Sequence, residues 1–194
     1  MRLIVMLTLA ARLVWAGGTV IGRTVTVCSQ PAAHGLTMYQ AQVQASGIFA
    51  RAGVKIGWRG IRACPTGAIQ VNLLDDAPES SHPGALAYSL PYEGTQIVVF
   101  YDRIRRESTV DTSTLANVLA SVLVHEITHL LQGLSTHSET GVMKARWDER
   151  DLGQMRLRPL ALAPEDIDRI QRRLDVRSRK AAPVAGSSSS AAAE

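Results

Sequence analysis

The chain has 194 residues, 46% of them hydrophobic, which is enough for one domain with a buried core and too few for two domains of typical size. Its formal net charge is +4, and much of this charge comes from basic residues near the C-terminus: Arg169, Arg172, Arg173, Arg177, Arg179 and Lys180. Aromatic residues do not alternate with these charges. The cluster is therefore typical of a solvated helix face, and we expect no nucleic-acid partner.

The first residues have the pattern of an export signal. Arg2 precedes an apolar run over residues 3–11, and Ala16 offers a small residue at a cleavage position. We predict a signal peptide over residues 1–16 and an exported protein, periplasmic or secreted; because Arg12 interrupts the run, a first helix or strand of the domain is the alternative. The run is shorter than the roughly 18 apolar residues of a membrane helix, so no membrane span is expected after signal removal.

The cysteine content is limited to Cys28 and Cys64. In an exported protein these residues could form one disulfide that closes a long loop. The alternative is two buried thiols that act as small apolar side chains. Their spacing is not the Cys-x-x-Cys of a metal site, so we do not expect them to bind a metal.

Segments with strand character follow the N-terminal region in chain order. Runs that are β-branched, alternating or apolar and bounded by turn residues predict strands over residues 23–28, 54–58, 68–74, 85–90 and 95–101. A helix is predicted between the first two strands, over residues 36–52, with Gly53 as its stop. Its apolar residues at helical spacing are Leu36, Tyr39, Val43, Ile48 and Phe49.

Two further helices are predicted in the C-terminal half. Residues 113–132 are apolar nearly all round, which is typical of a helix inside a domain. Residues 163–174 begin with Pro164 and an acidic first turn. The chain ends in SSSSAAAE, and we predict a disordered tail over residues 177–194. The folded domain is thus expected over residues 19–176, in the α+β class.

The buried helix contains a His-Glu-x-x-His pattern. His125 and His129 are four residues apart, so their side chains share one helix face and can both reach a zinc ion at roughly 2.0–2.1 Å. Glu126 points about 100° away, beside the metal, where it can accept a proton from a water molecule. Hydrogen-bonded core histidines are the alternative, but a buried carboxylate without a positive partner is costly. The pattern therefore predicts a zinc hydrolase site.

A third protein ligand is needed if the fourth position of zinc is to hold water. Gly133 could end the helix in a left-handed conformation, and the chain could then turn back and bring His137 to the metal. On spacing alone His137 could equally be an exposed loop residue. The last ligand could instead be an acid, Glu139, Asp148 or Glu149.

With Met143 included, this region resembles the metzincin zinc peptidases, and most of all the matrixins. The clan has an HExxH helix, a glycine, a third histidine and a downstream methionine turn. The resemblance implies three zinc ligands, a general base and a methionine beneath the metal: His125, His129 and His137, Glu126, and Met143. Gly133 follows the second histidine by four residues and precedes the third by four, one more than the clan pattern in each case. The turn must absorb two extra residues, which costs little loop entropy.

Two other segments support the resemblance. PGALAYSLP, residues 83–91, is similar to the edge strand on which matrixins bind an extended peptide. In that role Ala85, Leu86, Ala87 and Tyr88 would present backbone groups to the substrate. Residues 162–174 resemble the closing helix of a matrixin domain.

The implied fold is a single metzincin-like domain. It has a mainly parallel twisted sheet with an antiparallel edge strand, a backing helix, a central active-site helix and a short C-terminal subdomain that ends in a helix. The implied function is that of a zinc endopeptidase acting on peptides or proteins, and we expect it to be exported and monomeric. A zinc-stabilised binding domain without catalytic activity, derived from a peptidase, is the alternative.

Overall fold

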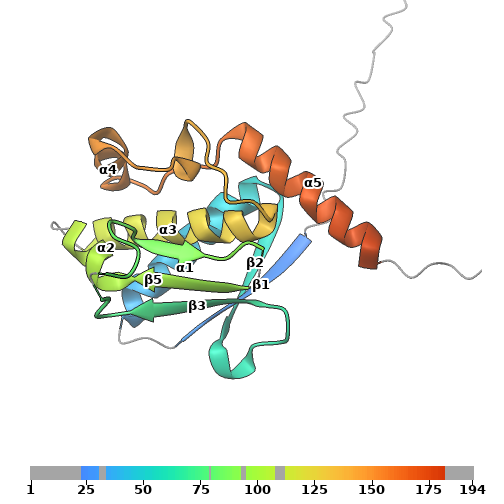
Figure 1. Cartoon of the computed structure of the whole chain (residues 1–194), viewed down its shortest axis with the longest axis horizontal. Coiled ribbons are helices and arrows are strands. Elements are labelled where there is room, and N and C mark those ends of the chain that lie inside the picture. The colour runs from blue at the N-terminus through green and yellow to red at the C-terminus, as the bar shows by residue number, and fades with distance from the viewer. Residues whose placement is uncertain (1–22, 31–33, 79, 93–94, 108–111, 182–194) are drawn as a thin grey trace, which may run out of the picture.

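The structure is a computed structural model that describes residues 23–30, 34–78, 80–92, 95–107 and 112–181 (Figure 1). The signal peptide predicted over residues 1–16 lies outside the described residues.

A five-stranded sheet forms the centre of the molecule. Its strands are β1 (Arg23–Ser29), β2 (Val54–Gly60), β3 (Ile69–Leu74), β4 (Ala87–Ser89) and β5 (Gln96–Phe100). They lie in the order β2-β1-β3-β5-β4, and every neighbouring pair is parallel except β4 and β5. This arrangement confirms the prediction of a mainly parallel sheet with an antiparallel edge strand.

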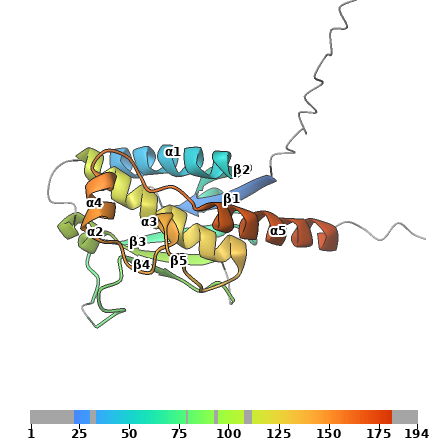
Figure 2. The same ribbon diagram turned by 90° about the horizontal axis from the view of Figure 1, so that it is seen from above.

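The helices are α1 (Gly35–Arg51), α2 (Tyr101–Glu107), α3 (Thr112–Gln132), α4 (Glu149–Met155) and α5 (Pro164–Ala181), with short 3₁₀ turns η1 (Ile61–Ala63) and η2 (Gly141–Met143). Helices α1 and α3 pack against each other on one face of the sheet (Figure 2). The segment from η2 to α5 forms the short C-terminal part, and its elements η2, α4 and α5 all contact α3. Helices α2 and α4 were not predicted.

Helix α3 is the core of the domain. Seventeen of its residues are buried, and large side chains such as Leu119, Leu123 and Ile127 are fully buried. In the described part of the chain it is also the one helix long and apolar enough to cross a membrane, but 89% of its most apolar window is buried inside the fold. The composition of α3 is thus that of a core helix, as its apolar circumference predicted.

Helix α1 lies where it was expected but does not bury all of the apolar residues that predicted it. Leu36, Tyr39 and Val43 are 65%, 63% and 54% exposed. The helix packs through Thr37, Met38, Ala41, Ala45, Ile48 and Phe49 instead. Small residues such as Ala41 and Ala45 allow α1 to approach α3 closely, so the buried face is set by fit as well as by hydrophobicity.

Helix α5 is longer than predicted, and it corrects the proposed domain boundary. The helix continues to Ala181, so residues 177–181 do not belong to a disordered tail. Arg177 donates a hydrogen bond of 3.1 Å to the carbonyl oxygen of Leu130, near the end of α3. This contact ties the last turns of α5 to the domain. Residues 182–194 lie outside the described residues.

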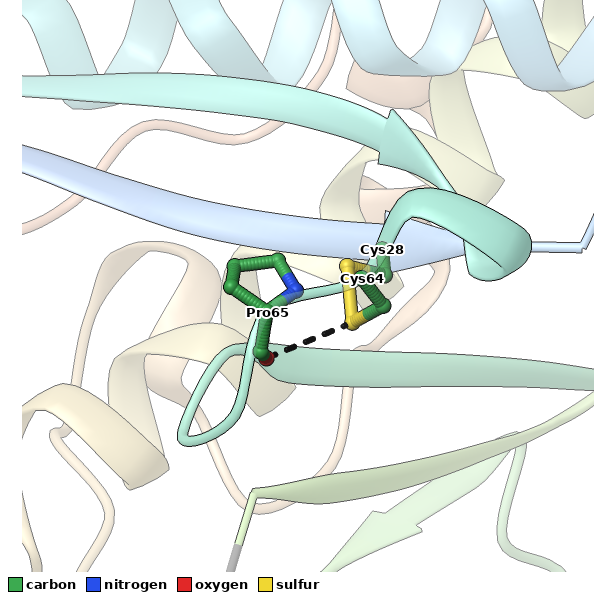
Figure 3. Close-up of a disulfide and its surroundings, with 3 residues drawn as sticks. All are labelled: Cys28, Cys64 and Pro65. Carbon is green, nitrogen blue, oxygen red and sulfur yellow. Dashed lines mark hydrogen bonds between the residues drawn. A yellow bond between two sulfur atoms is a disulfide. The ribbon is translucent and has the colours of Figure 1, made fainter.

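The two cysteines form a disulfide between β1 and the loop that leads to β3 (Figure 3). Their Cα atoms are 5.8 Å apart across a sequence separation of 36 residues. Cys28 is fully buried. The sulfur of Cys64 lies 3.8 Å from the carbonyl oxygen of Pro65. Of the two states that the sequence left open, the structure has the disulfide.

Candidate metal centre

The HExxH residues lie in the C-terminal half of α3. His129 and Glu126 are buried, with 6% and 7% of their surface exposed, and His125 is half-buried. The rings of His125 and His129 lie with their centroids 4.7 Å apart at an interplanar angle of 78°. The four-residue spacing therefore places both imidazoles on the same side of the helix, as expected from helical geometry.

The end of α3 turns the chain back towards these histidines. Gly133 has φ +65°, and its N–H donates to the carbonyl oxygen of His129 at 2.8 Å. The N–H of Leu134 reaches the same oxygen at 3.3 Å. This is the left-handed C-cap that Gly133 was predicted to form. The extra residue before the glycine lengthens the helix to Gln132 instead of distorting it.

A buried carboxylate organises the returning segment. Asp166 at the start of α5 is fully buried, and its Oδ1 accepts hydrogen bonds from Ser138 Oγ at 2.8 Å, Gln132 Nε2 at 3.3 Å and Arg169 at 3.1 Å. Because Ser138 directly follows His137 and Gln132 ends α3, these bonds connect the loop, the helix end and α5.

The three histidines are consequently brought together. The ring of His137 lies 5.3 Å from that of His125 and 5.0 Å from that of His129, measured between centroids. One nitrogen atom from each ring lies within 4.8 Å of the other two, and this is the one such group of metal-binding side chains in the described part of the chain. The longer spacing on both sides of Gly133 therefore does not prevent His137 from reaching the other two.

The hydrogen bonds of the two helix histidines determine which nitrogen atoms are free. His125 Nδ1 lies 2.8 Å from the carbonyl oxygen of Val142, and His129 Nδ1 lies 2.9 Å from that of Leu134. A carbonyl oxygen can only accept, so both Nδ1 atoms carry the proton in the neutral rings. Both Nε2 atoms then present lone pairs, and these atoms are 3.0 Å apart. Two facing lone pairs repel unless a cation lies between them.

Burial favours the neutral form of both rings. It lowers the pKa of His125 to about 4, an effect that the hydrogen bond to Val142 partly opposes. Burial likewise lowers the pKa of His129 to about 4, and the positive charge that His125 would carry lowers it further. Neutral imidazole is the form that binds a metal. Three imidazole nitrogen donors, two of them oriented through backbone carbonyls, fit a tetrahedral zinc site with one open position.

Glu126 lies in surroundings suited to proton transfer. Burial raises the pKa of its carboxyl group above the ordinary value, and the nearby hydroxyl of Ser89 and the imidazoles of His129 and His137 oppose that rise. A carboxylate whose pKa is shifted towards neutrality is a better general base near pH 7 than an ordinary glutamate.

Met143 lies in η2, a turn that packs against α3. Its side chain is fully buried. The preceding residue, Val142, receives hydrogen bonds on its carbonyl oxygen from both His125 and the indole N–H of Trp147, the latter at 3.1 Å. Gly141 has φ +72°, and a Cβ atom there would lie 2.7 Å from the carbonyl oxygen of Ala161. The turn is thus fitted closely between α3 and the segment before α5.

The histidines open onto a cleft of about 700 Å³. Residues 83–89 line part of it, and residues 144–147, with Leu152 of α4, line another part. Strand β4 lies at the sheet edge and pairs with β5 through Ala87, Tyr88 and Ser89. It is shorter than the strand predicted over residues 85–90. Ala85 and Leu86 precede it, although Leu86 still accepts a hydrogen bond of 2.9 Å from the backbone N–H of Phe100.

The acidic residues considered as alternative ligands do not join the histidine group. Asp148 caps α4 through its hydrogen bonds to the backbone N–H groups of Arg150 and Asp151, and it pairs with Lys144 at 2.7 Å. Lys144 and those hydrogen bonds lower the pKa of Asp148 to about 2. Glu139 and Glu149 are exposed.

Sequence reasoning missed several residues of the site. Asp166 was expected only as part of an acidic first turn, and Trp147 was given no role. Ser89 was included in a predicted strand without a role. Each depends on a contact across many residues, for which the sequence carries no local pattern.

Comparison with known proteins gives a fold but no family. No protein-family model matches the sequence, and no curated protein matches it. Among solved structures, the chain is similar to archaemetzincin from Methanopyrus kandleri, with a TM-score of 0.58 and 11% sequence identity over 79% of this chain and 96% of that one. The chain therefore has an archaemetzincin-like fold, with a mostly parallel five-stranded sheet and a cluster of three histidines.

Proposed function

We propose that this protein is an exported zinc-dependent endopeptidase. The observation that carries the proposal is the convergence of His125, His129 and His137, with the Nε2 lone pairs of the first two facing each other at 3.0 Å. The fold neighbour is named as a metzincin, and this is the clan whose motif the HExxH helix and Met143 of this chain resemble. A zinc ion in this position would supply Lewis-acid activation of a water molecule.

The residues of the chain would divide the remaining work. Glu126 would accept a proton on its carboxylate and later deliver it to the leaving amine, which its buried position and raised pKa favour. The free edge of β4 would bind the substrate backbone as an added strand. The part of the cleft lined by residues 144–147, including Trp147, would exclude water and receive a substrate side chain.

Two finer parts of the proposal have their own support. Export is supported by the pattern of residues 1–16 and by the disulfide, since disulfides persist mainly in oxidising compartments. A matrixin-like arrangement is supported by the serine that directly follows His137 and by the sequence of the edge strand.

The decisive test compares wild type with Glu126→Gln after both proteins are loaded with zinc. Both should bind one zinc ion, but turnover of a peptide library should fall by about 10²–10⁴-fold in the variant, the usual contribution of a general base. A chelator should abolish wild-type turnover, and added zinc should restore it.

A non-catalytic domain gives a different result in the same experiment. It would bind zinc and be stabilised by it, but the wild type would cleave none of the peptides. His137→Ala, measured in parallel, should lower zinc affinity by orders of magnitude if His137 is the third ligand, whereas Glu139→Ala should leave it unchanged.

A further inference from the structure

One guanidinium group lies among four backbone carbonyl oxygens beside the edge strand. Arg103 Nη1 donates to His82 at 2.8 Å and to Ala85 at 2.8 Å, and Nη2 donates to Pro78 at 3.0 Å and to Ser81 at 2.7 Å. All four acceptors belong to the loop of residues 78–85. Arg103 itself lies on α2, directly after β5.

This arrangement fixes the loop to a rigid part of the fold. Arg103 is half-buried, and its guanidinium carbon lies 4.1 Å from the centre of the Phe100 ring, which is itself buried. Stacking on an aromatic ring and donating to several carbonyls at once are properties of arginine that lysine does not share. In the described part of the chain, no other side chain gathers four carbonyl oxygens.

The loop leads directly into the proposed substrate strand. Ala85, which Arg103 contacts, is followed by Leu86, whose carbonyl oxygen accepts from Phe100, and then by β4. The loop also folds back on the strand, because the ring of His82 stacks on that of Tyr88 with centroids 4.1 Å apart and an angle of 12°. Because His82 has φ +47°, which is unfavourable for a non-glycine residue, the loop needs such contacts to keep this conformation.

We propose that Arg103 is a positioning residue for peptide substrate. By holding the loop of residues 78–85, it sets where the free edge of β4 lies relative to Glu126 on the facing helix. The same loop and strand form one wall of the cleft over the histidines. This role rests on the proposed peptidase function. It concerns the binding of substrate along β4 and not the proton transfer by Glu126.

The test uses the full-length, zinc-loaded protein with Arg103→Lys and Arg103→Ala. Arg105→Lys is the matched control, because Arg105 lies on the same helix, is exposed and makes no hydrogen bond to the described residues of the loop. Two measurements are made on each protein: hydrogen exchange of the backbone amides of residues 80–89, and KM and kcat for a peptide long enough to lie along β4.

Both Arg103 variants should exchange faster in this segment, while the control behaves as wild type. KM should rise by about tenfold or more, the loss expected when charge-assisted hydrogen bonds are removed, with kcat changed by less than about twofold. Free guanidinium at millimolar concentration should lower the KM of Arg103→Ala and leave that of Arg103→Lys unchanged, because only alanine leaves space between the four oxygens. If Arg103→Ala does not fold, Arg103→Lys carries the test.

Unchanged exchange in Arg103→Lys would overturn the proposal, and so would a fall in kcat at constant KM. The proposed function fails separately, by absence of turnover in the wild type. In that case the exchange measurement still decides whether Arg103 holds the strand, and a labelled peptide that binds equally to wild type and Arg103→Lys would refute the role.

Discussion

The orientation of the helix histidines follows from two backbone carbonyl oxygens. The carbonyl oxygens of Val142 and Leu134 each accept a hydrogen bond from an Nδ1–H group, so Nε2 is the nitrogen left free for a metal in both rings. These carbonyls come from two different segments, the 3₁₀ turn and the loop after α3. The folded chain thus orients the ligands before a metal binds, which reduces the entropic cost of binding.

The lowered pKa values of these histidines predict how the zinc-free protein responds to acid. His125 and His129 have pKa values near 4 in the fold and near 6.5 when unfolded. Between these values the unfolded chain binds more protons, so the free energy of unfolding should fall as the pH falls from 6.5 to 4. Thermal unfolding in the presence of a chelator, measured across this range, tests the prediction.

A variant without the two imidazoles isolates their effect. The raised pKa of Glu126 acts in the opposite direction, because that group stabilises the fold more at low pH than at high pH. The double variant His125→Asn, His129→Asn keeps Glu126 and removes both histidines. A loss of stability in acid that is equally steep in wild type and in this variant would show that the histidines are not responsible.

For single residues of the site, prediction from the sequence succeeded where the partners lie close together in the sequence. The spacing of His125 and His129 on a helix is enough to place both on one side. His137, Asp166 and Arg103 are different, because each acts through contacts with residues distant in the sequence or through a turn of irregular shape. Spacing alone therefore left the position of His137 open and only the resemblance made it a ligand, while Asp166 and Arg103 were given no role.

Secondary-structure elements were predicted best where one periodic pattern extends over many residues. Helix α3 was predicted almost to its ends, and β1, β2, β3 and β5 within two residues. The short helices α2 and α4 have no such pattern. A signal for α4 was present, because Asp148 and Asp151 form a capping box at its start.

The apolar pattern of α1 predicted the helix but not its orientation. Leu36, Tyr39 and Val43 recur at helical spacing and are all exposed. The buried face of the helix includes Ala41 and Ala45, and a hydrophobicity pattern gives little weight to such small residues. Helix α5 was predicted too short because its last residues are mostly basic, although arginine and lysine favour helix formation.

Gly141 offers a test of how tightly η2 is fitted against its neighbours. Gly141→Ala would place a Cβ atom 2.7 Å from the carbonyl oxygen of Ala161 in a backbone with φ +72°. Unfolding free energy should fall by at least about 1–3 kcal/mol, the usual cost of a left-handed conformation in a non-glycine residue. Zinc affinity should fall as well, because the adjacent Val142 orients His125. Chemical denaturation and zinc titration measure the two effects.

Gly153→Ala is the matched control, and it should raise the unfolding free energy instead of lowering it. Gly153 lies in α4, and a Cβ atom there would meet nothing within 4 Å. Replacing a glycine inside a helix by alanine stabilises by about 0.5–1 kcal/mol. Equal changes in unfolding free energy for the two substitutions would show that the backbone at Gly141 tolerates a side chain.

The whole molecule has a narrow junction within its sheet. Strand β1 pairs with β2 along its full length, from Arg23 to Ser29, but with β3 only from Val27 to Ser29. The pair β2-β1 is therefore joined by a short ladder to the strands β3, β5 and β4, which include the wall of the cleft. The disulfide reinforces this junction, since Cys28 lies within the short ladder and Cys64 in the chain just before β3.

Removal of the disulfide should therefore affect stability strongly. Its sequence separation of 36 residues corresponds to roughly 3–4 kcal/mol of unfolding free energy in the chain-entropy model. A reductant should lower the unfolding free energy of the wild type by this amount and so move its denaturation midpoint to a lower denaturant concentration. The double variant Cys28→Ala, Cys64→Ala should begin at the lower midpoint and not respond to the reductant. Because the ladder next to the disulfide is short, hydrogen exchange in the reduced protein should increase first at Ile69, Gln70 and Val71. A wild type whose midpoint is insensitive to complete reduction would show that the ladder alone holds the two parts of the sheet together.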